Sequence, residues 1–143
     1  MLFDVCAGRH LSTCFNNLRN IMFTDHELLK LAAKAAGLEP DKAEWTQRAG
    51  LVWIQHVDGI RKEFRWNPID DDGDALRLAV KLRIKFRYNE ALGQALAWTG
   101  GHPDFESRAN IEDCGHDENA CARLAIVRAA AEIGRKMKNG EVV

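Results

Sequence analysis

Two hydrophobic periodicities alternate along the chain. Across residues 24–37 hydrophobic side chains recur every three or four positions, which predicts an amphipathic helix. Thr24 and Glu27 have the spacing of a capping box, in which each side chain accepts a hydrogen bond from the other residue's main-chain N–H. Across residues 51–66 the period becomes two, and Asp58-Gly59 at its centre is a strong signal for a hairpin with a type I′ turn.

The register of this hairpin follows from its turn. Pairing Val57 with Ile60 across Asp58-Gly59 separates side chains of different character onto the two faces. One face carries Leu51, Trp53, Val57, Ile60, Phe64 and Trp66, and the other carries Arg61, Glu63 and Arg65 beside Val52, Ile54 and His56. We therefore expect one mainly hydrophobic face and one face rich in charged side chains.

Helical spacing returns over residues 75–82. It follows Asn67-Pro68, which ends the second strand, and a run of aspartates that suits the N-terminus of a helix. Residues 84–88 alternate again and predict a strand. Residues 94–98 fit the second strand of another hairpin, although residues 91–96 also fit a helix.

The last element is the most regular one. A helix is predicted from Glu118 to about Lys138, with Asp117 as its N-cap. Its wide hydrophobic face implies deep packing against a sheet. Between the second hairpin and this helix, residues 99–103 are predicted to form a loop and residues 106–111 a short edge strand.

The predicted order of elements is α-β-β-α-β-β-α. We therefore expect an α+β fold for a single domain over residues 22–138, with a central, mostly antiparallel sheet and helices on both faces. Residues 1–21 show neither periodicity, and we expect a disordered extension there, with Met22 as an alternative start of translation. Residues 139–143 are expected to be a C-terminal tail.

Composition narrows the classes of function. Of 143 residues, 46% are hydrophobic and 29% are charged, which is typical of a globular domain. The formal net charge of -1 supplies no overall field toward nucleic acid or acidic lipid, so any such binding must be local. Apolar runs are far shorter than the roughly 20 residues of a membrane span. Without an export signal, we expect a cytoplasmic protein with reduced thiols.

Two groups of residues have partial metal-ligand spacing. Cys6, His10 and Cys14 recur every four residues, but three ligands do not close a structural zinc site. Of the other cysteines, Cys121 falls on the apolar side of the last helix, where a free cysteine acts as a small core residue, and His116 lies between it and Cys114.

The second group is rich in aspartate. Asp70, Asp72 and Asp74 match positions 1, 3 and 5 of a calcium-binding EF-hand loop. The match fails later, because position 6 is Ala75 rather than glycine and position 12 is Lys81 rather than glutamate. We therefore expect neither a metal ion nor another cofactor.

Three segments together resemble a known family. They are FTDHELLKLAAKAAGL at residues 23–38, WNPIDDDGDALRLAVKL at residues 66–82 and ARLAIVRAAAEIGRKM at residues 122–137. They resemble small phage and prophage proteins with the phage ABA sandwich domain, and the stretch that begins with WNP is the most specific part. The resemblance implies helices on both sides of an antiparallel sheet, a phage origin and a location in the bacterial host cytoplasm. It implies no activity and no catalytic residue.

Two groups of residues are candidates for a specific role, one in binding a partner and one in the structure. Arg61 and Arg65, together with Lys85 and Arg87, could form a basic sheet face that contacts nucleic acid or another partner, or a solvated surface balanced by nearby acids. The second group is a structural motif, in which Trp66 is a core anchor, Asn67 bonds its own turn and Pro68 fixes the backbone. This motif consists of Trp66, Asn67, Pro68 and Asp74.

No catalytic motif accompanies these residues. The chain contains no glycine-rich phosphate loop, no GxSxG sequence and no HExxH pair. The favoured hypothesis is therefore a non-enzymatic phage accessory protein that binds a host or phage protein. The alternatives are a nucleic-acid-binding module that uses the basic face and, less favoured, a small hydrolase or transferase.

Overall fold

The computed structural model describes residues 23–100 and 102–138. The predictions for residues 1–21 and 139–143, including Cys6, His10 and Cys14, lie outside this part. The elements in order are α3 (Asp25–Ala35), η1 (Pro40–Lys42), β1 (Glu44–Thr46), β2 (Gly50–Val57), β3 (Ile60–Trp66), α4 (Asp72–Leu82), β4 (Ile84–Asn89), β5 (Gln94–Thr99), β6 (His102–Asn110), η2 (Ile111–Cys114) and α5 (Glu118–Lys138). The fold is α+β, as expected.

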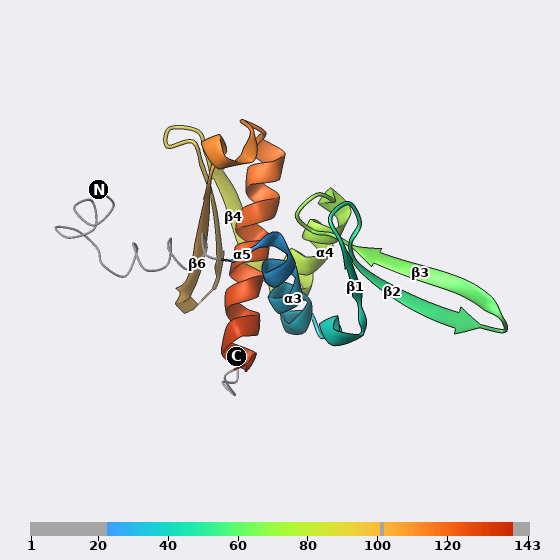
Figure 1. The fold of residues 1–143 in the computed structure, drawn as a ribbon. Helices are drawn as coiled ribbons and strands as arrows, with labels where there is room; N and C mark the ends of the chain where they lie inside the picture. Colours follow the sequence, from blue (N-terminus) through green and yellow to red (C-terminus); the bar gives the residue numbers. More distant parts are fainter. Residues whose placement is uncertain (1–22, 101, 139–143) are drawn as a thin grey trace.

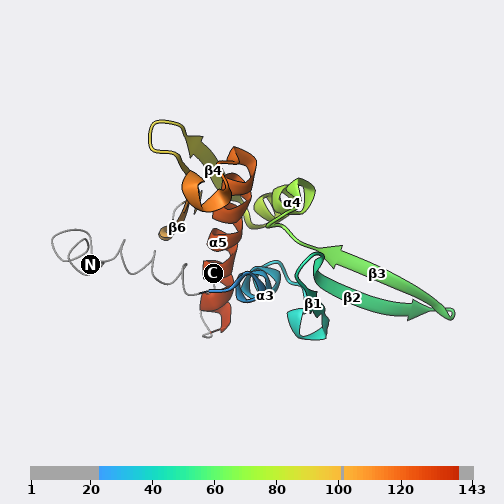
Figure 2. The same cartoon turned by 45° about the horizontal axis from the view of Figure 1, so that its top comes forward.

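The strands form two separate antiparallel sheets of three strands each. Their orders are β1-β2-β3 and β4-β5-β6, whereas the sequence pattern predicts one central sheet. The sheets separate because β3 ends at Trp66, before Pro68, and α4 then intervenes before β4 begins. Figures 1 and 2 show β2 and β3 on one side of α5 and β4 on the other.

Helix α5 lies at the centre of the packed body. It contacts all three strands of the second sheet, and α3 and α4 contact it as well. In Figure 1 it passes between the sheet and these two helices. The layers are therefore sheet, α5, then α3 with α4, rather than helices on both faces of a central sheet. Small side chains, among them the fully buried Cys121 and Ala125, allow this close packing on several sides.

Helix α3 begins and ends as its sequence predicts. The Glu27 N–H donates to Thr24 Oγ1 at 3.2 Å, and the Thr24 N–H donates to Glu27 Oε2 at 2.9 Å, which confirms the capping box. Gly37 follows the helix with φ of +81°, a left-handed conformation that glycine adopts readily. Leu28, Leu29 and two alanines of its inner face are buried.

The strand predictions are confirmed in part. Val57 pairs with Ile60, and the register continues to Leu51 and Trp66. Residues 94–99 form a strand that pairs with β4, so the helical alternative for residues 91–96 is wrong. The edge strand β6 begins at His102, earlier than predicted, within the segment expected to be a loop. Strand β1 is absent from the predicted order.

Candidate interaction surfaces

The outer part of the first hairpin extends away from the body. Strand β1 pairs only with residues 50–52 of β2, so the hairpin is two-stranded from Trp53 through the turn to Phe64. We call residues 53–64 the arm. Figures 1 and 2 show it pointing away from the three helices. An isolated two-stranded hairpin has no core of its own, so its exposed side chains are available for contact.

One face of the arm is hydrophobic. The rings of Trp53 and Phe64 lie 5.6 Å apart, and Trp53 Nε1 donates a hydrogen bond of 2.9 Å to the Glu39 main-chain oxygen. This bond ties the inner end of the arm to the segment after α3. Phe64, at this inner end, is 53% exposed, and further out Ile60 is 61% exposed and Val57 is 43% exposed. The arm therefore presents a strip of large apolar side chains to solvent.

The opposite face of β3 carries alternating charges. Arg61 Nη2 lies 3.0 Å from Glu63 Oε1, and Arg65 Nη2 lies 3.2 Å from Glu63 Oε2. Both arginines therefore share one carboxylate on their own strand. These ion pairs are exposed, so each contributes roughly 0–1 kcal/mol to stability.

The motif after β3 holds the base of the arm. The Asn67 N–H donates to Asp74 Oδ2 at 2.9 Å, and Asn67 Nδ2 donates to Asp70 Oδ2 at 3.1 Å. Trp66 is buried in the core, and Pro68 is fully buried. A Cβ on Gly50 would lie 2.6 Å from the Trp66 oxygen, so β2 approaches this turn more closely than any other residue allows. These contacts join the end of β3 to the first turns before and within α4.

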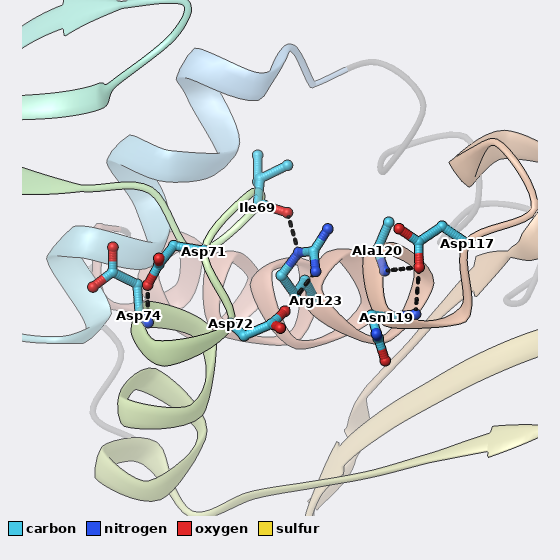
Figure 3. Close-up of polar contacts among 8 residues, drawn as sticks. All are labelled: Ile69, Asp71, Asp72, Asp74, Asp117, Asn119, Ala120 and Arg123. Carbon is cyan, nitrogen blue, oxygen red and sulfur yellow. Dashed lines mark hydrogen bonds and ion pairs between the residues drawn. The ribbon is translucent and has the colours of Figure 1, made fainter.

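The aspartates after this motif bind protein groups. Asp71 Oδ2 accepts a 2.8 Å hydrogen bond from the Asp74 N–H and caps α4 (Figure 3). Asp72 Oδ1 lies 2.5 Å from Nη1 of Arg123, and Arg123 Nε donates to the Ile69 oxygen at 2.7 Å. Arg123 therefore fastens the segment between β3 and α4 to α5. Sequence reasoning missed this residue, although an arginine inside so apolar a helix is a visible signal.

The four predicted basic contacts are not joined into one surface. Arg61 and Arg65 lie on β3, whereas Lys85 and Arg87 lie on β4 of the other sheet. Lys85 is paired in register with Trp98, and Arg87 with Leu96. Both basic side chains are exposed, and both are on the sheet face opposite to the buried Ile84. The structure therefore divides the predicted basic face into two pairs.

A shallow groove lies where α4, β4 and α5 meet. Its volume is about 220 Å³, and Leu76 and Phe86 contribute large exposed apolar side chains to it. The charged groups in its lining are Asp72 and Arg123, which form an ion pair with each other. A second hollow of about 480 Å³ runs along α3 and η1 and is lined by lysines and acids. Neither lining contains a Ser, Thr, Cys or His side chain.

Residues 23–100 and 102–138 contain neither a group of metal ligands nor a membrane-spanning helix. Within those ranges, no three His, Cys, Asp or Glu side chains are grouped so that they could hold a metal ion. None of the helices there is long and apolar enough to cross a membrane. Comparison with protein-family models, curated proteins and solved structures finds no match to this chain.

Proposed function

We propose that this chain is a non-enzymatic protein-interaction domain, which binds a host or phage protein through the arm. The observation that carries the proposal is the exposure of Val57, Ile60 and Phe64 on a ribbon that projects beyond the body. Large apolar side chains that stay in contact with water in this way are typical of interaction sites. The tight attachment of the base supports it, because a held arm loses little conformational freedom when it binds.

We also propose a phage or prophage origin and action in the cytoplasm of the bacterial host. The support is the resemblance of three segments to the phage ABA sandwich family. Two of the segments include α3 and α4, and the third lies within α5. In this structure α3 and α4 both pack on α5. On this proposal the sheet β4-β5-β6 corresponds to the family's central sheet, and α5 to the helical layer on one of its faces.

Affinity capture with a matched control tests the arm. Immobilised wild-type chain is compared with the double variant Ile60→Asp/Phe64→Asp in lysate of phage-infected bacteria. The control is Val80→Asp/Leu92→Asp, which changes two apolar residues that are 70% and 66% exposed elsewhere on the body. We expect the control to retain a captured protein and the arm variant to lose it. Equal capture by both variants would refute the role of the arm.

A second candidate function is nucleic-acid binding by the face of β4 and β5. Lys85 and Arg87 lie beside the half-buried Trp98 and Leu96, and basic side chains next to an aromatic ring suit single-stranded nucleic acid. A labelled oligonucleotide should then bind with an affinity that falls as salt rises, and Lys85→Ala/Arg87→Ala should weaken binding. Absence of binding at low salt would exclude this function.

A further inference from the structure

The outer edge of β3 is an open strand edge. In the order β1-β2-β3, no strand within the described residues pairs with it. Val57 and Ile60 flank a two-residue turn, so they exchange two main-chain hydrogen bonds with each other. Every second residue of β3 after Ile60 likewise exchanges hydrogen bonds with its partner on β2. The residues between them, Arg61, Glu63 and Arg65, therefore direct their main-chain N–H and C=O groups toward the open edge.

We propose that this edge pairs with the same edge of a second copy of the chain, antiparallel and about a twofold axis at Lys62. The inference rests on the proposed function, because it names a second copy as one partner of the arm. In this register Arg61 lies opposite Glu63 of the second copy, and Glu63 lies opposite its Arg61. On the other face Ile60 lies opposite Phe64, and between these two apolar pairs the two Lys62 side chains lie opposite each other. Opposite charges and apolar pairs that face each other across strands stabilise a sheet.

The other registers are less favourable. When the twofold axis is perpendicular to the sheet, each residue lies opposite a residue whose side chain is on the same face. Only a few registers of β3 against itself satisfy this condition. An axis at Glu63 would create three like-charged pairs, one between the two Glu63 carboxylates and two between Arg61 and Arg65, and no opposite-charged pair. The axis at Lys62 creates one like-charged pair, between the two Lys62 side chains, against two pairs of Arg61 with Glu63. An axis at Phe64 would place Ile60 opposite Pro68, which is buried in the body where β3 has ended.

The charges on the edge also explain selectivity. Charged side chains on an edge strand oppose pairing with arbitrary strands. Only a partner with the reversed order of charges satisfies them, and β3 itself provides that order when it runs antiparallel about Lys62. The pairing would add four main-chain hydrogen bonds, two from each of the Arg61 and Glu63 pairs. It would also join two marginal ribbons into one four-stranded sheet, in which the apolar side chains of both copies lie on one face beside Gln55 and Lys62.

The mass of the full chain in solution tests the pairing first. Sedimentation over a range of concentrations should show a reversible species of twice 16.1 kDa. Glu63→Arg should raise the dissociation constant about tenfold or more, because it sets arginine opposite Arg61. The double exchange Arg61→Glu/Glu63→Arg should restore the dimer, because the opposite charges face each other again. Glu44→Arg, on exposed β1, is the matched control and should leave the dimer intact.

A cross-link tests the register directly. At the axis the two Lys62 Cα atoms would form a pair without main-chain hydrogen bonds, about 4.5 Å apart, which a disulfide can bridge. Lys62→Cys should therefore give a covalent dimer on mild oxidation. Gln55→Cys, which is paired with Lys62 inside the same copy, is the control and should react much more slowly.

The outcomes separate this inference from the proposed function. A chain that stays monomeric at high concentration, or a Lys62→Cys variant that cross-links no faster than the control, would overturn the pairing. Capture of a protein partner that depends on Ile60 and Phe64 but survives in Glu63→Arg would leave the proposed function standing. A dimer that captures no other protein would support the pairing and would refute the proposed function.

Discussion

The contact between α5 and α3 leaves no room for a side chain at one glycine of α5. Gly134 lies inside α5 and is buried, and a Cβ there would lie 2.7 Å from the Leu31 carbonyl carbon, with its oxygen closer still. Real Cβ atoms do not approach main-chain atoms so closely, and ordinary contact begins near 3.4 Å. Because the Leu31 oxygen is the nearest atom, Gly134→Ala must move the two helices apart by about 1 Å or more.

Two effects of opposite sign determine how Gly134→Ala changes the free energy of unfolding. Alanine is favoured over glycine inside a helix by about 1 kcal/mol. Against this, a gap of about 1 Å forfeits about half of the attraction between packed groups. The buried Leu28 and Leu29 on α3 are each worth about 2 kcal/mol of burial, with smaller contributions from Ala32 and Ala33. The net prediction is a loss of about 1–2 kcal/mol.

Urea and thermal unfolding, followed by far-UV circular dichroism, measure this change. For a domain of this size we expect the melting temperature to fall by about 5 °C or more. Gly73→Ala is the control, because the nearest atoms to a Cβ there belong to the flexible Arg77 side chain and the Asp71 carboxylate at 3.2 Å. It should leave stability unchanged or slightly raised. A Gly134→Ala variant as stable as wild type would refute the reasoning.

Two further predictions concern Arg123 on α5 and Cys114 at the end of η2. Arg123→Ala should lower the free energy of unfolding by about 1–3 kcal/mol, measured by urea unfolding, because it leaves the Ile69 carbonyl and Asp72 without their partner. The second concerns the Cys114 thiol, whose pKa is raised to about 11 by burial and by the neighbouring Cys121. At pH 8 roughly 100-fold less thiolate than in an unperturbed cysteine should slow its alkylation, measured by peptide mass spectrometry, and the rate should keep rising toward pH 11.

Each of these two predictions can be contradicted by comparison with a control. Arg77→Ala removes an arginine that is 72% exposed and paired with Asp74, so it should change stability by less than about 1 kcal/mol. If Arg123→Ala were equally mild, the anchoring role would be wrong. If Cys114 in the folded chain reacted as fast as in the urea-unfolded chain, its burial would not control its reactivity.

Local patterns predicted the parts of the fold that depend on neighbours in sequence. The capping box at Thr24 and the register set by Asp58-Gly59 involve residues within a few positions of each other, so their chemistry is visible in the sequence. The division into two sheets is different, because it depends on whether β3 and β4 pair across α4. An alternating pattern such as that of residues 84–88 fits a strand in either sheet.

The candidate site also combines features that the local sequence predicts with features that depend on long-range packing. The hydrophobic and charged faces of the arm were predictable from alternation, but its projection beyond the body was not, since that depends on β1 being only three residues long. Arg61 and Lys85 looked like members of one basic surface because both occur on alternating strands. Their separation follows from long-range packing, as does the attachment of Arg123 to Ile69.

The central place of α5 sets an order of assembly during synthesis. This helix follows every other described element in the sequence, yet α3, α4 and the second sheet all pack on it. While a ribosome is still translating residues 118–138, these elements have no common core to join, and their apolar faces stay open to chaperones. The turn and the register of the arm need only contacts close in sequence, so the two strands can begin to pair on the nascent chain, and α5 later completes the core that contains Trp66 at the base. The surface proposed for recognition would thus begin to form before the body that carries it.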